Sequence, residues 1–187
     1  MRSLRFLALP LAAIAAIACK DKAPTSSASD APATAAGYRG PRTPSGAPIV
    51  TPPVGGFSSQ VLSRGSFSDD IDVTFRLKFD RATTVVHVND PSDVVMAKIT
   101  LQPNSSLPWH THHGPAIATV ASGELTVVGE DGCTLRSYGA GMAFIDPGQG
   151  HVHIGFNATG VETVVYVTYL DVPAGQSPLV PTVNPGC

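Results

Sequence analysis

The sequence predicts an all-β domain of consecutive short strands, and three observations support this. Apolar and polar residues alternate along residues 71–79, as in a strand with one buried face. Glycine and proline are abundant, with 18 and 17 of 187 residues, which suits tight turns between strands. No segment after residue 18 shows helical periodicity. Many short strands at even spacing predict a β-sandwich or a β-barrel.

Alternation and turn signals place the strands of this domain in order. Residues 122–124, Ser-Gly-Glu, predict a hairpin, and Asp131-Gly132 predicts the next turn. The last segment, 161–172, is rich in Val, Thr and Tyr, which favour strands. The expected strands are 71–79, 84–88, 94–101, 116–121, 125–128, 133–138, 142–145, 151–156 and 161–172.

The first eighteen residues have the pattern of a secretory signal peptide. Arg2 and Arg5 precede an apolar run over 6–18, which is short for a membrane span. Two cleavage sites are open: an A-x-A site at 16–18, or a site resembling the lipobox of bacterial lipoproteins, in which Cys19 is lipidated. We favour the lipoprotein, because cysteine is scarce and Cys19 lies directly at the predicted cut. The prediction is export across the bacterial inner membrane to the cell envelope, in the periplasm or at the cell surface.

The remaining chain divides into a linker, one domain and a tail. Residues 19–56 contain the lipidated cysteine and a spacer rich in Ala, Pro, Ser and Thr, which buries too little apolar surface to fold. We expect one β-barrel domain over 57–172 and a C-terminal tail over 173–187. The formal net charge is −2, and loss of the two signal arginines makes it more negative. Nothing therefore indicates nucleic-acid binding.

The two cysteines left after lipidation of Cys19 are expected to pair. Cys133 and Cys187 are an even pair in an oxidising compartment. A free thiol at an exposed C-terminus would also be reactive outside the cell. We predict a disulfide that pins the tail, because residues 173–186 have little else to hold them.

Five of the six histidines fall in two short runs. His110 and His112 are two residues apart, so in a strand they project from the same face. His153 on a facing strand would supply a third imidazole across the barrel interior. Imidazole binds divalent transition metals well, and the pattern therefore predicts a metal site.

Two motifs in this region resemble those of the cupin superfamily. The first cupin motif reads G-x5-H-x-H-x3-4-E-x6-G, and His110, His112 and Gly123 match it. Asn104 replaces the first glycine and tolerates the same left-handed turn. Ala116 stands where the motif has glutamate.

The second cupin motif reads G-x5-P-x-G-x2-H-x3-N. Gly141, Pro147, Gly150, His153 and Asn157 match it, with one extra residue before Gly150. The resemblance covers about 71–172 and implies a cupin-type jelly-roll β-barrel.

The resemblance implies a divalent metal, Fe, Mn, Ni, Zn or Cu, bound by His110, His112 and His153. Without a carboxylate at Ala116 the site would have three imidazole ligands and an open coordination position, as catalytic sites do. Three-histidine centres are found in cupin-type iron dioxygenases. His151 has the same strand parity as His153 and competes with it as third ligand; otherwise we expect it to carry protons.

The other candidate residues are expected to stay outside the metal site. We place His113 at the rim and His87 in solvent. Trp109 could line the mouth of the barrel, but packing in the core or at the rim is favoured. At most one of Tyr166 and Tyr169 can line the pocket, because they face opposite ways.

Three functions are consistent with this sequence. The first is a metal-dependent enzyme on a small organic molecule, with iron(II) dioxygenase-like chemistry. The second is a non-catalytic module that holds a metal or small ligand, and the third is a metal-free structural barrel. The expected partners are a small-molecule ligand or substrate and the membrane, through the lipid anchor; a homodimer remains open.

Overall fold

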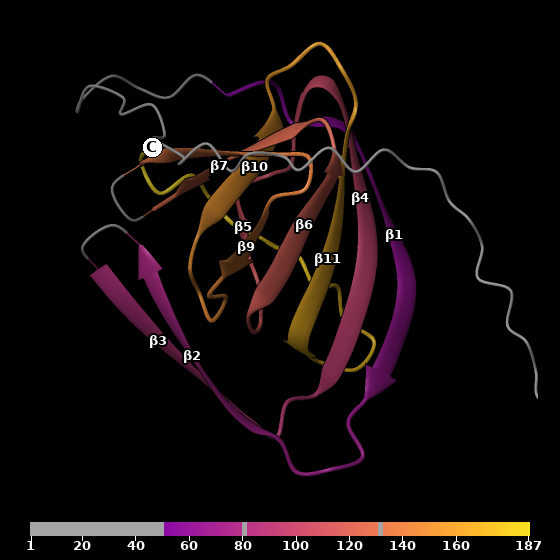
Figure 1. Cartoon of the computed structure of the whole chain (residues 1–187), viewed down its shortest axis with the longest axis vertical. Helices are drawn as coiled ribbons and strands as arrows, with labels where there is room; N and C mark the ends of the chain where they lie inside the picture. Colours follow the sequence, from indigo (N-terminus) through magenta and orange to yellow (C-terminus); the bar gives the residue numbers. More distant parts are fainter. Residues whose placement is uncertain (1–50, 80–81, 131–132) are drawn as a thin grey trace, which may run out of the picture. The chain divides into compact units, whose positions relative to one another are not determined.

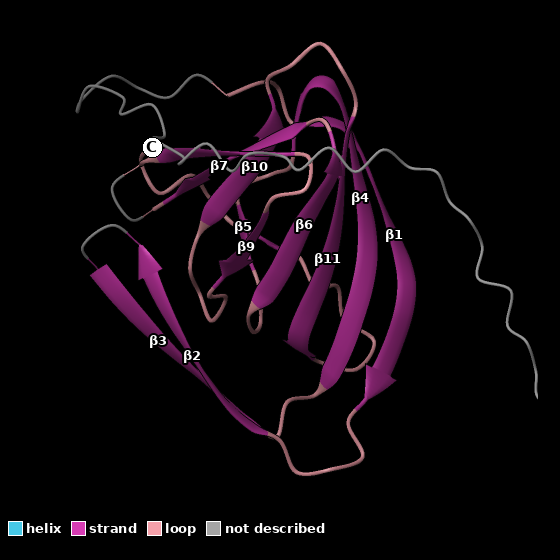
Figure 2. Cartoon of the chain, in the orientation of Figure 1, coloured by secondary structure: helices cyan, strands magenta, loops and turns pink. Residues whose placement is uncertain are grey.

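The computed structural model describes residues 51–187 apart from 80–81 and 131–132. The predicted signal peptide, Cys19, most of the linker and the Asp131-Gly132 turn lie outside the described residues. Within them, all regular structure is β-strand, and no helix could cross a membrane (Figure 2). The strands are β1 (Gly55–Ser66), β2 (Asp72–Phe79), β3 (Ala82–Asn89), β4 (Asp93–Ser106), β5 (His110–Thr111), β6 (Ala116–Ser122), β7 (Glu124–Gly129), β8 (Leu135–Gly139), β9 (Ala143–Asp146), β10 (His153–Asn157), β11 (Thr163–Val172) and β12 (Val180–Pro181).

Ten of these strands form one antiparallel sheet that curls into a jelly-roll β-barrel. One part runs β1-β4-β11-β6-β9, and the first four of these strands are seen side by side in Figure 1. The other part contains β12, β5, β10, β7 and β8. The end of β4 pairs with β10 at Ser105 and Ser106, and so joins the two parts. The all-β fold predicted from the sequence is therefore correct.

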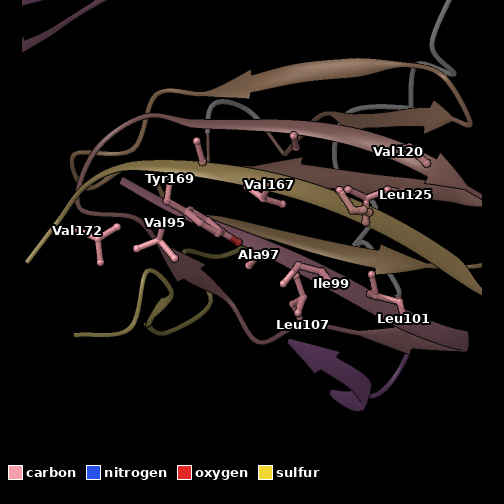
Figure 3. Close-up of a cluster of buried hydrophobic side chains, with 13 residues drawn as sticks. Val95, Ala97, Ile99, Leu101, Leu107, Val120, Leu125, Val167, Tyr169 and Val172 are labelled. Carbon is pink, nitrogen blue, oxygen red and sulfur yellow. The ribbon is translucent and has the colours of Figure 1, made fainter. Parts of the chain in front are cut away.

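The barrel core is made by strands whose side chains alternate between buried and exposed. On β4, Val95, Ala97 and Ile99 are buried, whereas Met96 between them is 45% exposed. The same alternation on β6 and β11 supplies most of a cluster of thirteen buried hydrophobic side chains, and most of the cluster is labelled in Figure 3. Asn104 has a φ of 54°, the left-handed geometry expected where the motif has glycine.

Two features at the start of the domain differ from the expectation. No strand was predicted before residue 71, yet β1 pairs with β4 over most of its length and begins at Gly55, inside the expected linker. Its residues after Gly55 are exposed, so no alternation of burial marks it in the sequence. The second feature is the pair β2 and β3, expected among the barrel strands, which forms a separate two-stranded sheet (Figure 1).

The C-terminal tail is held by more than the disulfide that the sequence predicts. Cys133 and Cys187 are joined, with an S–S distance of 2.11 Å. The expectation that little else holds the tail is wrong, because β12 pairs with β5 and the Thr182 amide donates to the Trp109 carbonyl at 2.8 Å. Strand pairing of two residues is too short to leave a sequence signal.

Candidate metal centre

Two of the predicted ligands lie in and directly after the short strand β5. His110 and His112 are 2% and 5% exposed. Nδ1 of His110 lies 2.8 Å from the Pro108 carbonyl, and Nδ1 of His112 lies 2.8 Å from the Pro178 carbonyl of the tail. A carbonyl only accepts, so each Nδ1 carries the proton. Nε2 of both rings is left with a lone pair, the form in which histidine binds metals.

The third predicted ligand faces them from β10. His153 pairs in register with His110, and their ring centroids are 4.3 Å apart. The ring of His112 is 5.1 Å from that of His153. One ring nitrogen from each histidine lies within 4.8 Å of the others. The structure therefore brings together the three histidines that the sequence predicted, and they could hold one metal ion.

Burial keeps these imidazoles neutral. It lowers the pKa of His153 to about 4, against the opposing effect of Asp146. Burial also lowers the pKa values of His110 and His112 below 6.5. Neutral imidazoles are what a divalent metal requires, and protonated rings would repel it. The donor set thus fits a transition metal.

The three rings line a small cavity in the barrel, which we call the interior cavity. Its volume is about 50 Å³, and its other walls are Ala116, Asp146, Tyr169 and apolar side chains of β4, β6, β7, β9 and β11. The Tyr169 ring lies 5.0 Å from that of His112, and burial raises the pKa of Tyr169. Tyr166 on the same strand is 43% exposed, so only Tyr169 lines the cavity, as the strand parity allows.

Asp146, at the end of β9, is a site residue that was not predicted from the sequence. This carboxyl is 5% exposed and lines the interior cavity. Oδ1 accepts from the Gly148 amide at 2.8 Å, and Oδ2 lies 2.8 Å from Nδ1 of His151. Burial alone would raise the pKa of Asp146, but His153 and the hydrogen bond to His151 outweigh it and lower the pKa, so Asp146 is a carboxylate. An acidic residue directly after the apolar run 143–145 is the sequence pattern that could have identified Asp146.

His151 takes a different position from His153. It precedes β10, its side chain is 22% exposed, and its Nδ1 is bonded to Asp146. Asp146, His151 and His153 form a second group whose ligand atoms lie within 4.8 Å of one another. The turn before His151 packs on the His112 segment, since the Gln149 amide donates to the His112 carbonyl at 3.0 Å and a Cβ at Gly148 would overlap the Gly114 carbonyl.

A second and larger cavity lies beside the interior cavity, and we call it the outer cavity. Its volume is about 420 Å³, and β3, β7, β8, β9 and residues 146–151 line it. Asp146, Val127 and Phe144 line both cavities. His151 lines only the outer one. Asp146 therefore borders both the cavity of the three-histidine group and a space of substrate size, and His151 lines that larger space beside it.

The remaining candidates stay outside the interior cavity. Trp109 packs against a second buried cluster that includes Val128 and Phe156, in line with the expected core or rim packing. His87 is exposed on β3, where its Nε2 lies 2.6 Å from Oδ1 of Asp72. His113 is half-buried and does not line the interior cavity.

One family model and several solved structures are similar to part of this chain. Residues 97–169 match the family model described as "Cupin domain". Similar solved structures include an oxalate oxidase, with 30% identity over 48% of this chain and 46% of that chain and a TM-score of 0.40. A polyketide cyclase from Streptomyces resistomycificus has 22% identity over 49% and 61%, with a TM-score of 0.42. A cupin superfamily protein from Desulfitobacterium hafniense has 12% identity over 72% and 100%, with a TM-score of 0.41.

The alignments cover only part of the first of these relatives. The chain spans 46% of the oxalate oxidase and 61% of the polyketide cyclase. No curated protein matches the chain. The domain match, together with the observed barrel, supports the cupin superfamily for this part of the chain.

Proposed function

We propose that the domain is a metal-dependent enzyme that acts on a small organic molecule, with a divalent transition metal held by His110, His112 and His153. The observation that carries this proposal is the convergence of three buried, neutral imidazoles on one cavity. A structural zinc site would have four protein ligands, whereas here Ala116 leaves an open side. Bound there, such a metal supplies Lewis acidity and, as iron(II), dioxygen chemistry.

The volumes of the two cavities favour a metal in the interior cavity and an organic ligand in the outer one. The interior cavity, about 50 Å³, has room for an ion and one or two small molecules such as water. The outer cavity, about 420 Å³, falls in the range of about 300–1,000 Å³ that holds small organic ligands. We therefore assign the organic ligand to the outer cavity. His151, bonded to Asp146 through Nδ1, can pass a proton between that cavity and the Asp146 carboxylate.

We further propose that the protein is a lipoprotein of the cell envelope, anchored through Cys19. The charged-then-apolar start of the chain and the cysteine directly after it support this. Cys19→Ser should move the protein from the membrane fraction to the soluble fraction. A wild-type protein that begins at Cys19 without lipid would show that ordinary signal cleavage operates instead.

The experiment that tests the enzymatic proposal combines metal analysis with turnover. The domain is purified, reconstituted with iron(II) under anaerobic conditions, and screened for oxygen uptake with small organic compounds. Stoichiometric metal with compound-dependent oxygen uptake supports the proposal. Stoichiometric metal with ligand binding but no turnover would favour a binding module, and absence of metal would favour a structural barrel.

A further inference from the structure

The charge that Ala116 does not provide is present on the neighbouring strand. Ala116 is 2% exposed and lines the interior cavity. Strand β6 pairs with β9 in the register that sets Asp146 directly opposite Ala116. Asp146 lines the same cavity and is the only carboxylate among the described residues that do so. A carboxylate thus enters the barrel at the level of Ala116, but from β9.

The contacts of Asp146 bring its carboxylate to the candidate metal ligand His153 rather than to the open side of the site at Ala116. Oδ2 lies 3.2 Å from Nδ1 of His153, a short contact that is not aligned as a hydrogen bond. That Nδ1 is buried and has no hydrogen-bond partner among the described residues. The three-histidine group does not include Asp146, whereas the second group does. Asp146 therefore contacts His153 but is not a member of the three-histidine group.

We propose that Asp146 is the counter-charge and the positioning residue of the metal centre, acting through Nδ1 of His153 in place of a carboxylate at position 116. This inference rests on the proposed function, since it requires a metal at the three histidines. A dipositive ion among neutral imidazoles and apolar walls is costly without a nearby negative charge. A carboxylate beside a ring nitrogen of a ligating histidine offsets the charge of the ion, and where that nitrogen donates to it the carboxylate also orients the ring.

The test measures metal affinity and not activity. Calorimetry with Co²⁺ compares the wild type with Asp146→Asn, which keeps the shape of the side chain and removes its charge. The expected affinity is about 10–100-fold lower, with the visible spectrum of the Co²⁺ complex still that of three nitrogen ligands. Asp72→Asn is the matched control, because Asp72 forms an exposed aspartate–histidine pair with His87 and should leave the affinity unchanged.

A second pair of variants tests whether Asp146 stands in for the missing carboxylate. In an Ala116→Glu background the new carboxylate lines the same cavity, so Asp146→Asn should cost a clearly smaller factor there than in the wild type. If Asp146→Asn lowers the Co²⁺ affinity by the same factor in both backgrounds, Asp146 does not take the place of a carboxylate at position 116. If Asp146→Asn alone does not fold, Co²⁺ binding is measured in the double variant Ala116→Glu/Asp146→Asn. Binding by the double variant supports the proposal, and absence of binding contradicts it.

The outcomes separate this inference from the proposed function. A wild-type protein that binds no Co²⁺ would contradict both the proposed function and this inference. If the wild type binds Co²⁺ and Asp146→Asn binds it with the same affinity, only the inference about Asp146 is contradicted. A Co²⁺ spectrum that loses a ligand in Asp146→Asn would show that Asp146 binds the metal directly, which also overturns action through His153.

Discussion

His153 and His110 face each other as a register pair of strands β10 and β5, with ring centroids 4.3 Å apart. The two paired histidines are more than forty positions apart in the chain and come from different sequence runs. Because β12 pairs with β5 on its other side, the C-terminal tail supports the same strand. The candidate metal centre is thus built by three segments that meet only in the folded barrel.

The second group, Asp146, His151 and His153, offers a competing location for the metal. We expect His110→Ala to abolish metal binding and His151→Ala to retain it, because His151 lies outside β10 and uses Nδ1 to bond Asp146. Metal analysis of both purified variants checks this. Retention of metal in His110→Ala with loss in His151→Ala would move the site to the second group.

Removing the disulfide should weaken both the fold and the metal site. The bridge closes a loop over 54 residues, which corresponds to about 4 kcal/mol in the chain-entropy model. The tail that it pins also carries the Pro178 carbonyl, which holds Nδ1 of His112. Cys133→Ser should therefore lower the urea midpoint and also the metal affinity. Stability and affinity equal to those of the wild type would show that strand β12 holds the tail without the bridge.

Mild acid should destabilise the metal-free protein. Burial lowers the pKa of His153 from 6.5 to about 4, and lowers the pKa values of His110 and His112. Between these values the unfolded chain binds protons that the folded chain does not, so the free energy of unfolding falls as the pH falls. This contribution is complete above about pH 6.5 and is lost progressively towards pH 4.

Thermal melts of the metal-stripped protein between about pH 7 and pH 5 measure this effect. The Tm should fall with pH in the wild type and fall less steeply in His153→Leu, which removes one buried imidazole. A Tm that stays constant across the window in the wild type would mean that the three rings are not buried in the neutral form.

Asn157 should contribute to stability and not to metal binding. Its side chain is fully buried, and Nδ2 donates to the carbonyls of Gln102 and Val161, at 3.1 and 2.7 Å, while Oδ1 accepts from Thr159. Asn157→Ala leaves buried groups without partners, at about 1–3 kcal/mol each. Urea unfolding should show this loss, whereas the exposed Asn89→Ala should change little. Equal stability of Asn157→Ala and the wild type would exclude this role.

The strands and the three histidines could be predicted because each leaves a local pattern. Alternation marks β4 and β11, and the spacing of His110 and His112 survives although β5 is only two residues long. The left-handed turn at Asn104 was likewise readable, because few residues adopt that geometry.

The features that the sequence did not reveal depend on pairing between distant segments. Asp146 is significant only because β9 sets it opposite Ala116. The carbonyl that orients His112 belongs to Pro178. Because every residue has a backbone carbonyl, the sequence does not mark this one as part of the site. Strand β1 is exposed at every residue after Gly55, so its place in the sheet follows from hydrogen bonds with β4 rather than from a hydrophobic pattern.

The most direct test of the central claim is the number of metal ions per chain in the reconstituted wild type and in the three single variants His110→Ala, His112→Ala and His153→Ala. We predict one ion per chain in the wild type and almost none in each variant, while His87→Ala on the separate β2–β3 sheet binds one ion as the wild type does. One ion per chain in all four variants, or none in the wild type, would contradict a metal centre at the three histidines.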